Sequence, residues 1–172
     1  MLLFTFVSLV FLLVMGGFAI DFAYQVTAKN ELQRSMDAAA LAGAGKLGFD
    51  DTVFPTVRQF SQQYAAANPY RVGTVNLDLN PANTPSGNIV LGIWDGAAAS
   101  FTPSLDGTRV NAVQCQVQRT IPTSFLRLLG FNSLPLAASA VAISNPPANA
   151  GCGEPILPIG FTRCNFEQSW AF

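Results

Sequence analysis

The sequence predicts an α+β protein, with an N-terminal transmembrane helix that extends into a long amphipathic helix and is followed by a small antiparallel sheet. Three observations support this prediction. Residues 1–20 carry no charge, residues 22–47 lack proline and are rich in helix-favouring residues, and short alternating apolar segments separated by turn sequences occupy much of 70–145. The chain therefore combines an apolar helical part with a β-rich part.

The composition excludes several classes of function. Of 172 residues, 50% are hydrophobic and 11% are charged, against about 25% charged in an ordinary soluble protein. The 9 basic and 10 acidic residues provide no basic field for a nucleic acid. Histidine is absent, which excludes Ser-His-Asp and Cys-His catalytic sites and zinc sites built on histidine.

We interpret residues 1–20 as a transmembrane anchor, because a helix of this length reaches about 30 Å, the thickness of the hydrocarbon core. A cleaved signal peptide is the main alternative, since Gly17 and Ala19 are small residues before a cleavage site at Ile20. The missing basic region and the length of the apolar stretch argue against cleavage. A helix buried in a soluble core is a third interpretation.

The helix is expected to continue to about Leu47, and from Leu32 onward its apolar residues fall on one face. We call five of them the small-residue stripe: Leu32, Met36, Ala39, Ala40 and Gly43. The stripe either packs on the protein's own sheet or allows the close approach of a helix from a partner protein. We predict a partner interface at the stripe, near the membrane.

The rest of the chain predicts a second helix and a sheet of about four strands with short helices. Asp50–Thr52 offers caps for a helix with apolar positions Val53, Val57, Phe60 and Tyr64, ending at Asn68-Pro69. Strands are expected at 75–79, 89–94, 113–117 and 136–143, and a short helix at 123–129 before Gly130. This arrangement has some likeness to pilin architecture.

Several segments resemble a known family. The apolar stretch ending in Ala19-Ile20-Asp21, the pair Leu32-Gln33 and the run DAAALAGA at 37–44 resemble the N-terminal region of TadE/TadG-like proteins of the Flp (Tad) pilus-assembly system. The later part is similar to the companion domain of Tad-like Flp pilus-assembly proteins, up to about residue 147. The segments that carry this similarity are GIWD at 92–95, RVNAV at 109–113, RTIP at 119–122, LGF at 129–131 and AASAVAI at 137–143.

The resemblance implies a single-pass protein of the bacterial inner membrane that assists pilus assembly or secretion without catalysis. Its expected partners are the membrane, other pilus-assembly proteins and further copies of the chain, with no nucleic acid and no small-molecule substrate. The expected organisation is an anchor at 1–20, a helical stalk and second helix at 21–68, an extracytoplasmic β domain at 70–145 and a Pro-rich tail at 146–172. A soluble periplasmic or secreted binding or adhesion module, released by cleavage, is the alternative.

The start of the sequence departs from the family. Relatives begin with a short stub that contains arginine and glycine, whereas this sequence opens on Met1-Leu2-Leu3. Lys29 and Arg34 follow the apolar segment, so the positive-inside rule alone would place the larger part in the cytoplasm. The family resemblance favours an extracytoplasmic domain, and we expect a basic extension in the upstream reading frame. The apolar segment also lacks the glutamate of type IV pilins, which favours an accessory protein over a filament subunit.

No catalytic, cofactor or metal site is expected. The run Gly43-Ala-Gly-Lys46 lacks the preceding strand and the hydroxyl residue of a phosphate-binding loop, and Asp78, Asp95 and Asp106 are more typical of turns than of a calcium site. Asp21 is either a contact for a partner protein or a polar residue where the helix leaves the bilayer.

The three cysteines fall into two classes. Cys115 lies on the apolar side of a predicted strand and is expected to be a buried free thiol. Cys152 and Cys164 bracket a proline-rich loop and are expected to form a disulfide in an oxidising compartment.

Overall fold

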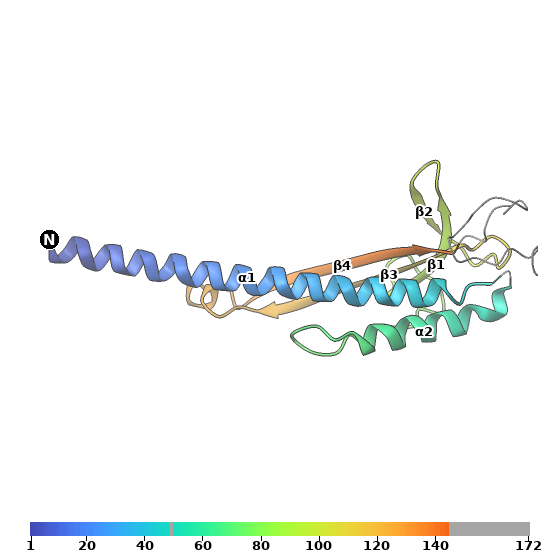
Figure 1. The fold of residues 1–172 in the computed structure, drawn as a ribbon, viewed down its shortest axis with the longest axis horizontal. Helices are drawn as coiled ribbons and strands as arrows, with labels where there is room; N and C mark the ends of the chain where they lie inside the picture. The colour runs from blue at the N-terminus through green and yellow to red at the C-terminus, as the bar shows by residue number, and fades with distance from the viewer. Residues whose placement is uncertain (49, 145–172) are drawn as a thin grey trace, which may run out of the picture.

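The computed structural model describes residues 1–48 and 50–144. Its dominant element is a single helix, α1 (Leu2–Ala44), whose first part projects well beyond the rest of the molecule (Figure 1). The predicted continuous helix is confirmed, although it ends at Ala44 rather than near Leu47. A short turn closes it, in which Lys46 N donates to Gly43 O at 2.9 Å and Leu47 N donates to Ala44 O at 3.1 Å.

The second helix, α2 (Phe54–Ala67), lies alongside the distal half of α1 (Figure 1). A 3-10 turn, η1 (Asp51–Val53), leads into it, and the Asp50 carboxylate accepts a hydrogen bond from Thr52 N at 3.0 Å. The predicted cap is therefore found on η1, since α2 itself begins after Val53 without a side-chain cap, and the predicted end at Asn68-Pro69 is confirmed. Of the apolar positions expected to face the core, Val57 is fully buried whereas Tyr64 is about half exposed.

Four antiparallel strands form one sheet in the order β2-β1-β3-β4. Their bounds are β1 (Ile89–Asp95), β2 (Ser100–Pro103), β3 (Ala112–Pro122) and β4 (Ser133–Ile143). The strands β3 and β4 pair along their whole length, from Ala112 opposite Ile143 to Pro122 opposite Ser133. They make a long hairpin that runs beside α1 toward its N-terminal half (Figure 1). The predicted α+β class is confirmed.

The hairpin ends in a short 3-10 helix, η2 (Leu126–Leu129). Gly130 follows with a φ of 93°, a left-handed conformation that glycine adopts without steric cost. The prediction of a short helix ending before Gly130 is therefore confirmed. Residues 123–132, which join β3 to β4, are called the hairpin tip below.

One predicted strand is wrong. Residues 75–79 are extended, and Val75 and Leu77 are buried while their neighbours are not, but the segment joins no sheet. Side chains bind its backbone instead: Gln62 Nε2 donates to Leu77 O at 2.7 Å and Asp78 N donates to Asn88 Oδ1 at 2.9 Å. The alternation therefore indicates that one face of the segment is buried. The fourth strand of the sheet is β2, which was not among the predicted strands.

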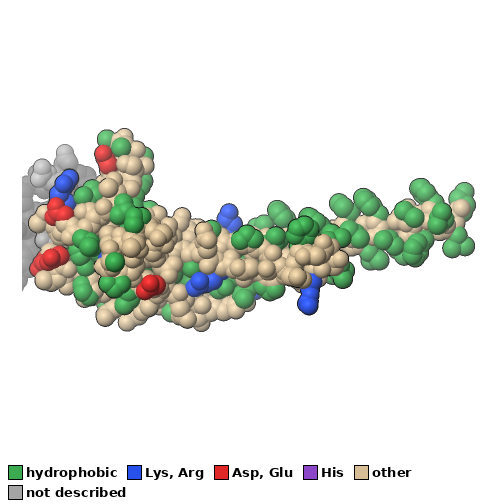
Figure 2. Space-filling model, turned by 180° about the vertical axis from the view of Figure 1, so that it is seen from behind, with side chains coloured by type: hydrophobic (Ala, Val, Ile, Leu, Met, Phe, Trp, Pro, Cys, Tyr) green, Lys and Arg blue, Asp and Glu red, His purple; other side chains and the backbone are tan. Residues whose placement is uncertain are grey.

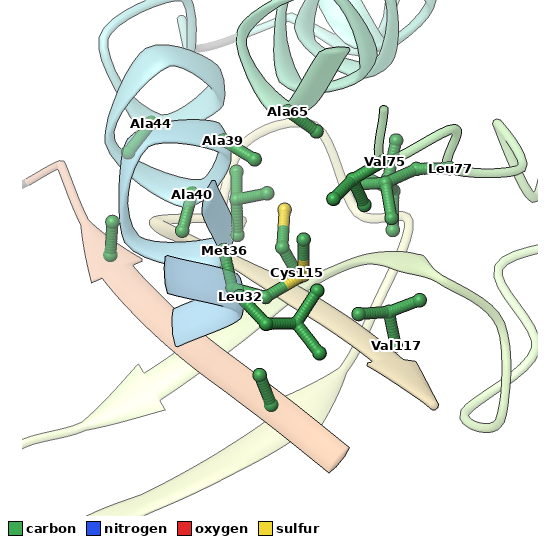
Figure 3. Close-up of a cluster of buried hydrophobic side chains, with 14 of the residues drawn as sticks. Leu32, Met36, Ala39, Ala40, Ala44, Ala65, Val75, Leu77, Cys115 and Val117 are labelled. Carbon is green, nitrogen blue, oxygen red and sulfur yellow. The ribbon is translucent and has the colours of Figure 1, made fainter. Parts of the chain in front are cut away.

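The core lies between the sheet on one side and the two helices on the other (Figure 3). Leu32 and Met36 of α1 pack toward Cys115 of β3, and Ala65 approaches from α2 (Figure 3). Alanine and glycine on α1 allow its backbone to lie close to both layers, because small side chains leave room for close approach. The distal half of α1 is thus a core helix, whereas residues 1–16 have no layer over them.

Candidate functional site: the junction of the apolar helix with the sheet

The N-terminal half of α1 exposes an unusual amount of apolar surface. Among the described residues, α1 is the one helix long and apolar enough to cross a membrane. Figure 2 shows its hydrophobic side chains along the narrow projecting end of the molecule. The large hydrophobic residues that are at least 44% exposed there are Met1, Leu2, Leu3, Phe4, Phe6, Val7, Leu9, Val10, Phe11, Leu12, Leu13, Val14, Met15, Phe18, Ile20, Phe22 and Val26.

The first close contact between this apolar segment and the sheet is made by the hairpin tip. Gly17 is buried, and a Cβ atom built on it would lie 2.7 Å from the ring of Phe125. Any larger residue at position 17 would therefore collide with that ring. Gly16 next to it has nothing within 4 Å of the same position. The absence of a side chain at Gly17 thus allows the tip to lie directly on α1.

One turn further along α1, the Asp21 carboxylate binds the backbone of the tip. It accepts hydrogen bonds from Ser124 N at 2.9 Å, Phe125 N at 2.8 Å and Leu126 N at 2.6 Å. Asp21 is 3% exposed. These N–H groups precede and begin η2, so the carboxylate satisfies donors that a helix start leaves unpaired. Asp21 therefore contacts its own chain, an arrangement that neither sequence-based interpretation included.

The hydrogen bonds also stabilise the charged form of this carboxylate. The bond from Leu126 N contributes most to lowering the pKa of Asp21 below its usual value, and burial opposes the effect. The junction therefore consists of a charged hydrogen-bonded contact at Asp21 and a close apolar contact at Gly17. No signal in the sequence pairs Asp21 with residues more than 100 positions away.

The small-residue stripe lies inside the molecule. Its five members are buried, with Leu32, Met36 and Ala39 fully inaccessible. A Cβ atom on Gly43 would overlap the Ser61 hydroxyl of α2, so Gly43 allows the two helices to approach closely. The chain's own sheet and second helix occupy the stripe here. Binding of a partner helix to the stripe stays a prediction, because it would require these contacts to open.

A buried polar cluster was missed by the sequence analysis. Arg58 is 4% exposed and its Nη1 donates to the carbonyls of Leu79 at 2.9 Å, Asn80 at 2.6 Å and Ile89 at 3.1 Å, while Nη2 donates to Asn83 Oδ1 at 3.1 Å. Burial lowers the pKa of Arg58, but a guanidinium remains charged at neutral pH. Arg58 lies on the face of α2 that carries the buried apolar residues. A charged residue on that face is the one sequence signal of a buried polar cluster.

Two asparagines complete the cluster and fix the loop before β1. Asn80 and Asn83 have φ values of 50° and 53°, a region in which asparagine is enriched. Asn83 Oδ1 also accepts from Leu91 N at 2.8 Å, and Asn83 Nδ2 donates to Leu91 O at 2.9 Å. Side-chain amides thus supply the hydrogen bonds that a neighbouring strand would otherwise provide, and the cluster is structural.

The motifs considered for chemistry have ordinary structural roles. Asp95 Oδ1 accepts from Ala97 N at 2.9 Å and Asp106 Oδ1 accepts from Thr108 N at 3.1 Å, which confirms that they are turn residues. The run Gly43 to Lys46 lies at the end of α1, with no strand before it. Within the described residues, no group of three potential metal ligands occurs.

The cysteine predictions are tested in part. Cys115 is fully buried and free, as predicted, and burial raises the pKa of its thiol to about 12. Cys152 and Cys164 lie outside the described residues, as does the Pro-rich tail. Their disulfide stays a prediction.

Comparison with protein families gives two matches that overlap at residues 42–46, at the end of α1. The model described as "Putative Flp pilus-assembly TadE/G-like" matches residues 1–46, which include the projecting helix, Asp21 and the stripe. The model described as "Putative Tad-like Flp pilus-assembly" matches residues 42–142, which include α2, the sheet and the hairpin tip. No curated protein and no solved structure matches the chain. Since the second match alone covers more than half of the sequence, the chain belongs to the Tad-like Flp pilus-assembly family.

Proposed function

We propose that this protein is a non-catalytic, single-pass component of the bacterial inner membrane that assists Tad/Flp pilus assembly or secretion through an extracytoplasmic domain. Membership of a pilus-assembly family supports the process. The structural observation that carries the membrane assignment is the continuity of α1. One helix provides an exposed apolar segment at its start and a core layer of the folded domain at its end.

The length of the exposed segment supports a spanning helix. Residues 1–20 reach about 30 Å as a helix, which matches the hydrocarbon core of a bilayer. Apart from Gly17 and the half-buried Ser8, every residue of this segment is exposed in the isolated chain. In water, such a surface would be an aggregation site, whereas in a bilayer it is the surface that faces lipid.

The junction favours an uncleaved anchor over a signal peptide. Cleavage before Ile20 would remove Gly17 and its contact with Phe125. It would also place the new N-terminus next to Asp21, whose carboxylate holds the hairpin tip. A segment that contributes to the packing of the mature domain is more typical of a permanent anchor than of a discarded leader.

The side of the membrane is proposed from the family rather than from charge. Pilus assembly builds a structure outside the cell, which supports an extracytoplasmic domain. Lys29 and Arg34 lie just beyond the apolar segment and oppose this orientation by the positive-inside rule. We propose that family membership outweighs this bias, so orientation is a direct test of the assignment.

The proposal of a non-catalytic role is supported by the lining of a hollow in the described part of the chain. A hollow between α1 and the β3–β4 hairpin is lined mostly by amides and small residues, and Lys29 is its one charged member. A general acid and base that converge in a cleft are the usual requirement for hydrolytic chemistry. The lining of this hollow supports a binding or structural role instead.

The function is tested by complementation of a strain that lacks the gene. The full chain should restore surface pili. A version in which residues 1–20 are replaced by a cleavable signal peptide should fold and be secreted but fail to restore them, because it lacks the anchor. Pili are counted by electron microscopy, and release of the truncated domain is followed by immunoblot.

Two outcomes would contradict the proposal. Restoration of pili by the secreted version would favour the alternative, a soluble periplasmic or secreted binding or adhesion module. Normal pili in the deletion strain itself would remove the assembly role. In either case the family assignment would stand, and the function proposed from it would not.

A further inference from the structure

The hairpin tip carries an exposed apolar cluster far from the projecting end of α1 in sequence. Phe125, Leu128, Leu129 and Phe131 are 43%, 85%, 59% and 57% exposed. Beyond residue 26 of the described chain, the large hydrophobic residues that are more than half exposed are Leu41 and three residues of the tip, Leu128, Leu129 and Phe131. Three of the four most exposed apolar side chains of the folded domain therefore lie in one ten-residue loop.

The position of the tip along α1 places this cluster at the end of the apolar segment. Phe125 packs on Gly17, and Asp21 binds the backbone of Ser124, Phe125 and Leu126. If residues 1–20 span the hydrocarbon core, Gly17 lies about 5 Å inside its boundary, at 1.5 Å per residue. The tip is then at the depth where acyl chains meet headgroups. Figure 2 shows hydrophobic side chains continuing from the narrow end onto the adjoining edge of the body.

The backbone of the tip is suited to a medium with little water. Leu128 N donates to Phe125 O at 3.0 Å, Gly130 N to Arg127 O at 3.1 Å and Phe131 N to Leu126 O at 3.1 Å. Asp21 satisfies three further N–H groups, and Thr123 N donates to Asn132 O at 3.1 Å. Backbone groups that lack water must be paired within the protein, and these bonds meet much of that requirement.

The charge of the tip also fits a lipid surface. Its sequence, TSFLRLLGFN, contains Arg127 and no acidic residue. Arg127 is exposed. A basic side chain beside apolar residues at the bilayer boundary can bind lipid phosphates while the apolar side chains enter the acyl region.

We propose that the hairpin tip, residues 123–132, is a second membrane contact, in which Phe125, Leu128, Leu129 and Phe131 enter the same leaflet that α1 leaves and Arg127 binds lipid phosphate. This inference rests on the proposed anchor. The domain would then be attached to the membrane at two places, the spanning helix and the tip that Asp21 binds. Two attachments fix the long sheet at a defined angle to the membrane. A domain held on one helix alone would be free to swing.

Depth-dependent quenching of tryptophan fluorescence tests the contact. The full chain, with Trp94 and Trp170 replaced by phenylalanine, is reconstituted into vesicles of phosphatidylethanolamine and phosphatidylglycerol with or without bromine on the acyl chains. Leu128→Trp reports the tip, Phe11→Trp reports the anchor, and Leu105→Trp is the matched control on an exposed loop before β3. Since Leu128 and Leu105 are substantially exposed, both replacements should leave the fold intact.

The expected result is a large loss of emission in brominated vesicles for Leu128→Trp and Phe11→Trp, with none for Leu105→Trp. Quenching at position 11 without quenching at 128 would overturn the second contact and leave the anchor standing. Loss of quenching at both positions would overturn the anchor itself. Quenching at position 11 alone would instead favour binding of the tip to another protein.

The role of Arg127 is tested in the Leu128→Trp protein. Arg127→Glu should reduce the quenching at position 128, because a carboxylate is repelled by the anionic headgroups. Arg109→Glu, a charge reversal at an exposed site next to the Asp106 turn, should leave it unchanged. Equal quenching in the two variants would refute a phosphate contact by Arg127.

Discussion

Asp21 is the residue on which the geometry of the junction depends. Its carboxylate accepts three backbone hydrogen bonds. Replacement by asparagine removes the charge and puts an NH2 donor in place of one acceptor oxygen. We expect Asp21→Asn to release the hairpin tip from α1. The measurement is hydrogen exchange at the amides of Ser124, Phe125 and Leu126 in the detergent-solubilised full chain, which should become faster.

The control is Asp37→Asn, an exposed position on the same helix whose carboxylate accepts from Gln33 Nε2 at 2.9 Å. It should leave exchange at the tip unchanged. If Asp21→Asn also left the three amides protected, the carboxylate would not be required to hold the tip on α1. The packing of Phe125 on Gly17 would then be enough to hold it there.

The lowered pKa of Asp21 predicts a pH dependence of the same contact. A carboxyl group whose pKa is lower in the folded protein stabilises the fold at pH values above its unfolded pKa, about 3.9, and loses that contribution as the pH falls through the folded value. Protection of the three amides should therefore persist at neutral pH and weaken in acid below about pH 4. Asp21→Asn should abolish this dependence.

At the scale of elements, the contact between α1 and α2 depends on the lack of a side chain at Gly43. Gly43→Ala would place a methyl group against the Ser61 hydroxyl, whereas the methyl group of Gly45→Ala would lie 3.5 Å from Leu41 O, an ordinary van der Waals contact. Gly45 is the C-cap residue just after α1, and its φ of -65° is one that alanine adopts without strain. We expect Gly43→Ala to be less stable than Gly45→Ala by about 1–3 kcal/mol, the usual cost of overpacking, measured by chemical denaturation.

Ser61→Ala should rescue Gly43→Ala. The Ser61 hydroxyl is buried and has no hydrogen-bond partner among the described residues, so its removal costs little. The double variant should recover most of the lost stability, giving a coupling energy of about 1 kcal/mol or more. Strictly additive effects of the two replacements would show that the helices are not in direct contact at these positions.

The segment before β1 is held by Arg58 in place of a paired strand. Arg58→Met keeps the length of the side chain but leaves the carbonyls of Leu79, Asn80 and Ile89 without this donor. We expect a loss of about 2–4 kcal/mol, because the buried cluster loses four hydrogen bonds from a charged donor and the Leu79 carbonyl loses its hydrogen bond from Arg58. Arg34→Met, at an exposed position of α1, should change stability by no more than about 0.5 kcal/mol. Equal effects would contradict the assigned role of Arg58.

The elements differ in how well local sequence predicts them. Both helices follow from the spacing of their apolar residues, and the turn η1 that leads into α2 follows from Asp50 as its cap, because these signals are local. In residues 75–79, apolar and polar residues alternate as in a strand, yet side-chain amides bind the backbone. The alternation therefore predicts which side chains are buried but not whether the segment pairs with another strand. The contact of Asp21 with Ser124 joins residues 103 positions apart, so no local pattern contains it. The small-residue stripe was correctly placed on one face, but sequence alone did not identify which helix approaches it.

The whole molecule is an elongated rod in which α1 and the β3–β4 hairpin run side by side (Figure 1). The apolar part of α1 lies at one end, and α2, β1 and β2 lie toward the other (Figure 1). Such a shape places the distal end of the domain well away from the bilayer if α1 spans it. An accessory protein of pilus assembly would then present that end to other components outside the cell.

The proposed function requires a single-pass anchor with an extracytoplasmic domain, and protease accessibility in intact spheroplasts tests this topology most directly. Added protease should digest the domain, leaving a short fragment of α1 that sediments with the membrane, while a cytoplasmic marker stays intact. Full-length protein that remains protected until the spheroplasts are lysed would contradict the orientation. A domain found in the supernatant before protease is added would contradict the anchor.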